Sequence, residues 1–93
     1  MAFLLKDPAA MLDYAIDWGA DYLEEDALAQ SAWSVAPLET GGAEVVGSSF
    51  DTKFATVKVS GGIAGRIYRV INRVVTQGGR EDSRSVVLRV EQR

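Results

Sequence analysis

The chain has 93 residues, of which 47% are hydrophobic and 25% charged, and its formal net charge is −3, a composition typical of a single globular domain. It contains no cysteine and no histidine, which excludes disulfides, cysteine nucleophiles, Ser-His-Asp triads and ordinary zinc sites, so we expect a protein that is not an enzyme and has no cofactor. We expect neither a membrane span nor a signal peptide, because no apolar run approaches about 20 residues and the opening MAFLLKDPAA is too short and soon too acidic.

The first ten residues are expected to form an N-terminal arm, and residues 11–93 a single domain. Phe3, Leu4 and Leu5 are consecutive apolar residues in this arm. We expect this run to dock on a neighbouring protein.

The segment from residue 11 to residue 18 has two competing interpretations. Asp7 followed by Pro8 suits the start of a helix. The alternation of apolar and polar residues, however, favours a strand with one apolar face. That face carries Leu12, Tyr14, Ile16 and Trp18. We therefore predict a strand over residues 11–18.

The acidic segment that follows, GADYLEEDA, predicts a loop with room for one short helical turn near residues 20–27. Its carboxylates are hard oxygen ligands of the kind that calcium prefers. Their spacing does not match an EF-hand loop, so a solvated acidic loop is the favoured interpretation and no metal site is predicted. Whether the loop Asp21–Asp26 binds a cation stays open.

Three further strands are predicted in the middle of the chain, from the segments LAQSAWSVA, AEVVGSSF and FATVKVS. They span residues 28–36, 43–50 and 54–60. The first ends at Pro37, because proline removes a donor from the strand ladder. Its expected inner face comprises Ala29, Ser31, Trp33 and Val35. In the third segment Ala55, Val57 and Val59 are expected to face inward.

The last third of the chain predicts a β-hairpin. RIYRVINRVVT (66–76) and SRSVVLRV (83–90) alternate around the turn QGGRED. The expected core face of the first strand comprises Tyr68, Val70, Asn72 and Val74. Tyr68 suits a tyrosine corner, in which the hydroxyl bonds to a nearby loop, as well as it suits an ordinary core position. Six or seven short strands with frequent turns predict an all-β fold, a small immunoglobulin-like β-sandwich.

Charge is unevenly distributed along the sequence. Residues 1–52 hold ten acids against one lysine, a net charge of −9, and residues 53–93 hold nine bases against three acids, a net charge of +6. Two interpretations stay open. The halves could pack together and neutralise one another within a subunit, or they could occupy different faces and let copies stack acidic side to basic side.

Arginines of the hairpin are candidates for a binding surface. They accompany isoleucines and valines, and arginine beside apolar area is typical of protein interfaces, although a charged, solvated strand face is the alternative. Nucleic acid is not an expected partner, because the chain as a whole is acidic, with a pI of about 4.8, and no aromatic platform accompanies the arginines. The expected interface residues are Phe3, Leu4, Leu5, Arg69, Arg73, Arg84 and Arg89.

Three segments carry a resemblance to a known family. They are KDPAAMLDYAIDWGADYL, SAWSV and SGGIAGRIYRVINRVVTQGGREDSRSVVLRVEQR. In this order, and over nearly the whole chain, they resemble the small tailed-bacteriophage proteins called fiber–tail adaptors. The middle segment ETGGAEVVGSSFDTKF matches the family pattern least.

The resemblance implies an immunoglobulin-like virion protein, made in the cytoplasm of the bacterial host and located in the phage tail or neck. It implies a ring of copies that joins other tail or neck proteins, and fibers, without catalytic residues. Two other functions stay open, a capsid decoration protein and a carbohydrate-binding module. The second would need Trp18, Tyr22 and Trp33 exposed, whereas strand periodicity buries both tryptophans.

Overall fold

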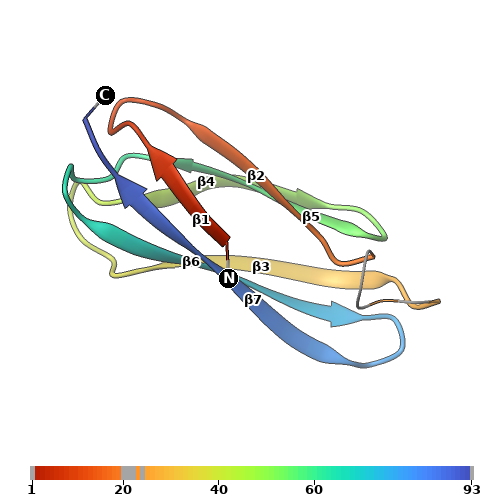
Figure 1. Ribbon diagram of the computed structural model, residues 1–93. Coiled ribbons are helices and arrows are strands. Elements are labelled where there is room, and N and C mark those ends of the chain that lie inside the picture. The colour runs from red at the N-terminus through yellow and green to blue at the C-terminus, as the bar shows by residue number, and fades with distance from the viewer. Residues whose placement is uncertain (1, 20–22, 24, 93) are drawn as a thin grey trace.

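The computed structural model of the chain describes residues 2–19, 23 and 25–92. In this part of the chain, seven strands form two sheets that pack face to face (Figure 1). The strands are β1 (Ala2–Lys6), β2 (Leu12–Asp17), β3 (Leu28–Ala36), β4 (Glu44–Phe50), β5 (Phe54–Ser60), β6 (Ile67–Thr76) and β7 (Glu81–Val90). The four-stranded sheet has the order β1-β7-β6-β3, and the three-stranded sheet has the order β2-β5-β4.

The predicted all-β sandwich is confirmed, and β2 to β7 begin and end within two residues of the predicted segments. Burial alternates as expected in β5 and β6, because one face of each strand packs on the opposite sheet. The helical turn expected near residues 20–27 falls partly on residues 20–22 and 24, which lie outside the described residues, and residue 23 with residues 25–27 contains no helix. A helix long and apolar enough to cross a membrane is likewise absent from the described residues.

Strand β1 forms one edge of the four-stranded sheet. Residues 2–6, which lie within the expected N-terminal arm, pair in parallel with β7 of the same chain. The Lys6 side chain is buried, and its ammonium group donates hydrogen bonds to the backbone carbonyls of Asp7 at 2.9 Å and Gly61 at 2.6 Å. Burial lowers the pKa of Lys6, and the negative charge of Asp7 partly offsets this effect. These contacts fasten β1 to the turn that follows β5.

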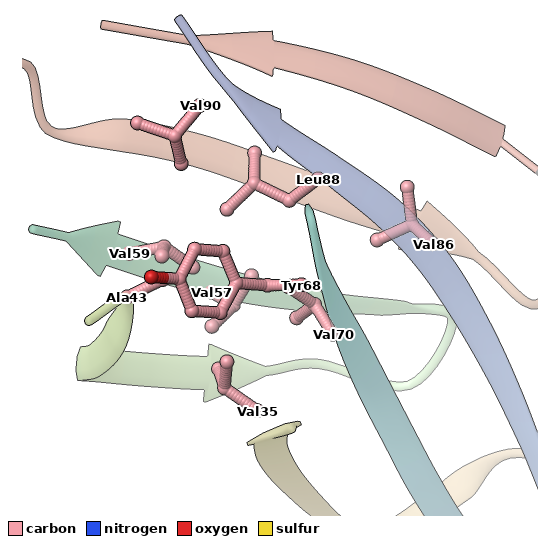
Figure 2. Close-up of a cluster of buried hydrophobic side chains, with 9 residues drawn as sticks. All are labelled: Val35, Ala43, Val57, Val59, Tyr68, Val70, Val86, Leu88 and Val90. Carbon is pink, nitrogen blue, oxygen red and sulfur yellow. The ribbon is translucent and has the colours of Figure 1, made fainter. Parts of the chain in front are cut away.

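The hydrophobic core lies between the two sheets. Figure 2 shows its larger cluster, in which side chains from both sheets meet: Val35, Ala43, Val57, Val59, Tyr68, Val70, Val86, Leu88 and Val90. The smaller cluster comprises Ile16, Trp18, Leu23, Leu28, Ala55 and Val74. Tyr14 and Trp33 pack against both clusters. Since each fully buried valine or leucine contributes about 1.5–3 kcal/mol, this continuous core holds the sandwich together.

The expected inner face of β3 is wrong at Ala29. Ser31 and Trp33 are partly buried and Val35 is buried, as predicted, but Ala29 is exposed. The pairing of β3 with β6 shifts register between Leu28 and Gln30. An irregularity of this kind adds a residue to one strand and inverts the alternation beyond it. Leu28 therefore takes the buried position that the simple alternation gave to Ala29.

Tyr68 forms the hydrogen bond expected of a tyrosine corner. Its hydroxyl accepts a hydrogen bond from the backbone N–H of Ile63 at 3.1 Å and donates one to the Glu39 carboxylate at 2.7 Å. Burial raises the pKa of Tyr68, opposed by the hydrogen bond from Ile63. The ring thus packs in the core while its hydroxyl holds two loops.

Candidate interaction faces

The outer face of the four-stranded sheet carries apolar side chains among arginines. Because side chains alternate along a strand and neighbouring strands are in register, Leu5, Arg89 and Ile67 stand side by side across β1, β7 and β6. We define the basic face as Phe3, Leu5, Ile67, Arg69, Ile71, Arg73, Val87 and Arg89. These residues come from β1, β6 and β7, and β7 pairs with each of the other two strands. They therefore form one face only when the sheet is folded.

Three large apolar side chains of the basic face are exposed. Phe3 is 57% exposed, Leu5 42% and Ile67 58%. Isolated exposed apolar side chains are common on proteins, whereas contiguous ones mark contact surfaces. Arginine is also enriched at protein interfaces. This face is therefore the best candidate for binding another protein.

The three arginines of the basic face differ in their partners. Arg73 pairs with Glu81 at 3.1 Å, and Arg89 pairs with Glu91 at 2.7 Å. Within the described residues, no hydrogen bond or ion pair engages the Arg69 side chain. Exposed ion pairs add little to stability, so these guanidinium groups can be engaged by a partner at little cost to the fold.

Two of the seven expected interface residues face the interior. Leu4 packs against the larger core cluster, because it alternates with its exposed neighbours Phe3 and Leu5. Arg84 is in register with the buried Asn72, and its guanidinium lies 4.4 Å from the centre of the Trp18 ring. The structure thus brings together five of the seven residues and separates Leu4 and Arg84 from them.

The outer face of the three-stranded sheet carries the opposite charge. Asp13, Ala15 and Asp17 of β2 are exposed and point away from the core. Asp13 is in register with Lys58 of β5, and Asp17 with Phe54. We define the acidic face as these five residues. In the described part of the chain neither aspartate side chain forms a hydrogen bond or an ion pair.

Ion pairs within the chain join the acidic and basic halves of the sequence. Arg66 pairs with Glu39 at 3.7 Å, and Arg80 pairs with Asp26 at 3.2 Å. The acidic and basic halves of the sequence therefore neutralise one another in part, through these two ion pairs. The outer faces of the two sheets nevertheless keep charges of opposite sign, so each sequence-based interpretation of the asymmetry describes part of the molecule.

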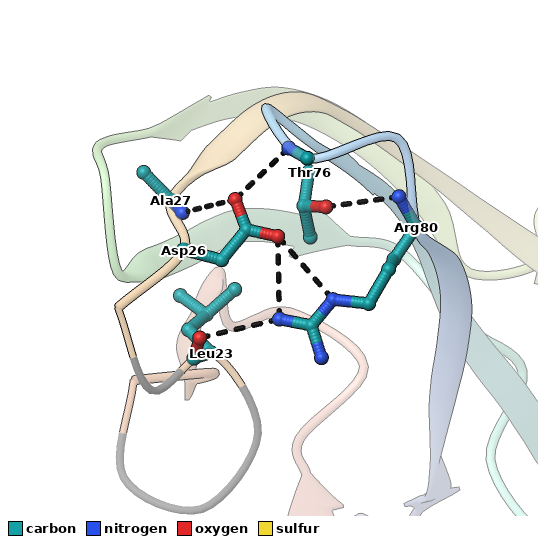
Figure 3. A network of polar contacts seen from close by, with 6 residues as sticks. Leu23, Asp26, Ala27, Thr76 and Arg80 are labelled. Carbon is teal, nitrogen blue, oxygen red and sulfur yellow. Dashed lines mark hydrogen bonds and ion pairs between the residues drawn. The ribbon is translucent and has the colours of Figure 1, made fainter.

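A loop network holds the turn between β6 and β7 against the start of β3 (Figure 3). The Arg80 guanidinium donates to Asp26 through Nε at 3.3 Å and Nη2 at 3.2 Å, and to the Leu23 carbonyl at 3.2 Å. Hydrogen bonds from the Thr76 hydroxyl and the Ala27 N–H lower the pKa of Asp26 to about 2. Asp26 therefore acts as a hydrogen-bonded anchor at the end of the acidic loop.

Among the described residues, no group of three or more carboxylate, thiol or imidazole side chains could hold a metal ion. The expected cation loop includes residues 21, 22 and 24, which lie outside them. Asp26, which is described, directs its carboxylate to Arg80 and to backbone amides.

Trp18 belongs to a buried polar bridge that we did not predict from the sequence. Its indole Nε1 donates to Asn72 Oδ1 at 2.8 Å, and both residues are fully buried. Asn72 Nδ2 donates to Ser31 Oγ at 2.9 Å and to the Ala32 carbonyl at 3.1 Å. The bridge joins the end of β2 to β6 and β3. A buried tryptophan cannot form a sugar-stacking surface, Trp33 is only partly exposed, and Tyr22 lies outside the described residues.

Comparison with known protein families identifies the chain. Residues 6–89 match the model of a family described as podophage GP4 fiber-tail adaptor protein gp77. The chain belongs to this family. It is accordingly a structural protein of the phage fiber–tail adaptor type, which makes phage tail and fiber proteins its partners and the virion its location. Comparison with curated protein sequences gave no match.

Proposed function

We propose that this chain is a non-enzymatic adaptor in the tail or neck of a phage particle, where it joins tail components to the fibers. The observation that carries the proposal is the family match over residues 6–89, nearly the whole chain. The protein would be made in the cytoplasm of the bacterial host and would act after incorporation into the particle.

The adaptor works by fixed shape and repeated contacts. A sandwich with a continuous core presents its two outer faces in a constant relative position, as an adaptor requires. The Tyr68 corner supports an immunoglobulin-like arrangement of the strands. Several copies around the tail axis would repeat the same contacts, and a ring of identical subunits needs a different patch on each side of every copy. The basic and acidic faces are such a pair.

The basic face is the proposed site of contact, with Phe3, Leu5, Arg69, Arg73 and Arg89 reaching a partner directly. Leu4 and Arg84 would act from the interior. Leu4 holds β1 on the core, and Arg84 packs on Trp18 beneath the four-stranded sheet. Substitution of Leu4 or Arg84 should therefore weaken assembly only as far as it disturbs folding.

The proposal is tested with phage particles produced in the absence of this protein and in its presence. Without it, tails should lack fibers, and the fiber protein should remain in the unassembled fraction. Complementation with the unaltered chain should restore fiber content, measured by quantitative mass spectrometry of purified particles. Particles that carry a full set of fibers without this protein would refute the adaptor role.

A further inference from the structure

We propose that the outer edge of β3 binds an extended segment of another tail or fiber protein by strand addition, with one apolar side chain of that segment entering a pocket between β3 and β4. The inference rests on the proposed function, because it names how one partner of the adaptor would be held. This edge lies at the opposite end of the four-stranded sheet from β1. It is therefore a second contact, separate from the basic face.

The outer edge of β3 carries unpaired backbone groups. β3 pairs with β6 on one side and with no described strand on the other. Among the described residues, no backbone hydrogen bond links residues 31–36 to any element except β6. Because backbone groups along a strand point alternately to its two sides, about half of those in residues 31–36 face outward. An added strand pairs with such a row of groups.

Charged side chains mark the other edges of the sandwich but not this one. Four strands form the edges of the two sheets in the described structure. β1 ends in Lys6, β2 contains Asp13 and Asp17, and β4 begins with Glu44. β3 is the longest of the four, with nine residues, and contains no charged residue. Charges are a common means by which proteins keep an edge from pairing with other chains, so β3 lacks this protection.

The two irregular features of β3 lie at its ends. The register with β6 shifts between Leu28 and Gln30, and Pro37 follows the last residue of the strand. Bulges and prolines also discourage edge pairing, but here they leave residues 31–36 regularly paired with β6. These residues form an uncharged, regular edge about 20 Å long, which is enough for a strand of typical length.

A pocket of about 310 Å³ lies beside this edge, between the outermost strands of the two sheets. It is lined by Trp33, Ser34, Val35, Leu38, Glu44 and Val45. Side chains of an added strand stand beside those of its neighbour and point to the same two faces of the sheet. One of them would therefore enter the pocket next to Trp33 and Val35. Most of the lining is apolar, so we expect a large apolar side chain there.

The indole of Trp33 supplies an unused hydrogen-bond donor in this pocket. Its Nε1 atom is buried and has no hydrogen-bond partner, whereas Nε1 of Trp18 donates to Asn72 at 2.8 Å. Unpaired buried donors are uncommon because they forfeit a hydrogen bond to water. A backbone carbonyl of the bound segment would provide the missing acceptor.

The occupant is a segment of a protein other than this chain. Two copies that paired their β3 edges about a twofold axis would cover both edges and stop at a dimer, whereas the proposed adaptor repeats around the tail axis. Glu44 is the only charged residue among those that line the pocket. An acidic residue opposite Glu44 would be repelled, so the fitting segment is extended, free of acidic residues and equipped with one large apolar side chain.

Hydrogen exchange tests the pairing of the β3 edge. Purified particles and the isolated full-length chain are pulsed with heavy water, quenched, dissociated and analysed by mass spectrometry with residue-level fragmentation. In the isolated chain, every second amide of residues 31–36 should exchange rapidly, because it points away from β6. In the particle these amides should slow by about tenfold or more and match the amides that point toward β6.

A cross-link identifies the bound segment. The chain contains no cysteine, so Leu38→Cys offers one site for a benzophenone maleimide at the mouth of the pocket. Leu38 is 83% exposed, and its substitution should not disturb folding. Illumination of labelled particles should join residue 38 to a segment of another tail or fiber protein. That segment, made as a synthetic peptide, should bind the isolated full-length chain in a calorimetric titration.

Two variants test the pocket against a matched control. Leu38→Lys places a charge beside the apolar side chain, and Trp33→Phe keeps an aromatic ring but removes the N–H donor. Each should weaken binding of the peptide by about fivefold or more. Met11→Lys, also an exposed apolar residue at 58% but preceding β2, should bind like the wild type. Urea denaturation of each variant shows whether it is folded, and Leu38→Lys suffices if Trp33→Phe is not.

Four results overturn the inference: rapid exchange of the outward amides in particles, cross-links only to a second copy of this chain, a peptide that does not bind, or binding that a folded Leu38→Lys leaves unchanged. Fiber content separates this failure from failure of the proposed function. If particles need the chain for their fibers while the outward amides stay rapid, the adaptor role stands and strand addition is wrong. Particles that carry fibers without the chain refute the adaptor role itself.

Discussion

Replacement of Asn72 by alanine should destabilise the sandwich more than any other single polar substitution in its core. Asn72 is fully buried, accepts a hydrogen bond from Trp18 Nε1 at 2.8 Å, and donates to Ser31 Oγ at 2.9 Å and to the Ala32 carbonyl at 3.1 Å. Asn72→Ala removes all three bonds at once. It also breaks the polar bridge between β6 and the end of β2, which belong to different sheets.

The expected loss in the free energy of unfolding follows from how deeply each partner of Asn72 is buried. Loss of the acceptor for the Trp18 indole N–H leaves a donor in the interior, at a cost of about 1–3 kcal/mol. The two bonds to β3 are only partly buried, so their loss adds about 1 kcal/mol in total. We expect the free energy of unfolding to fall by about 2–4 kcal/mol. Small domains are stable by only about 5–15 kcal/mol, and the Tm should drop by roughly 10–20 °C.

Urea denaturation followed by circular dichroism measures this change, with an unchanged m value expected. Ser34→Ala, an exposed position on β3, is the matched control and should change stability by less than about 0.5 kcal/mol. A double-mutant cycle with Trp18→Phe should give a coupling free energy of about 1–2 kcal/mol, since both single substitutions break the same bond. A loss below about 1 kcal/mol in Asn72→Ala would refute the assigned role of the bridge.

Three further substitutions test the loops. Tyr68→Phe removes the hydroxyl that holds the loop after β5 and should cost about 1–2 kcal/mol by urea denaturation; an unchanged midpoint would show that the corner adds nothing. The pKa of Asp26 is lowered to about 2 from 3.8, so the unfolded chain takes up the proton first and stability should fall as pH drops from 4 to 2. Asp26→Asn should flatten that part of the curve, and an identical curve would contradict the assignment. Gly62 has φ +110°, and a Cβ there would lie 2.7 Å from the Val90 side chain. Gly62→Ala should therefore lower the free energy of unfolding by about 1–3 kcal/mol. Gly47→Ala, where a Cβ meets open space, is the control and should lower it by less than about 0.5 kcal/mol.

Most of the strands could be predicted because one face of each is buried. The alternation in FATVKVS and RIYRVINRVVT is a local property, and it maps directly to the burial of β5 and β6. β1 could not be predicted in this way. Phe3, Leu4 and Leu5 show no alternation, and the parallel partner β7 lies at the other end of the chain.

The basic face was less predictable, because a residue belongs to it only if its side chain points to the outside of the four-stranded sheet. Arg84 and Arg89 are five residues apart in one strand, so alternation alone already puts them on opposite faces, and this signal was available from the sequence. Asn72 among core valines was a second signal, since a buried amide needs partners. Its partner Trp18 is 54 residues away, and no local pattern indicates that distance.

Immunogold labelling of purified phage particles with an antibody against this chain shows whether the protein is a tail component. The labelling is quantified by electron microscopy after the antibody has been shown to bind the folded protein on intact particles. We expect gold at the tail or neck, near the point where the fibers attach. Gold distributed over the capsid shell would contradict it and would identify a decoration protein instead.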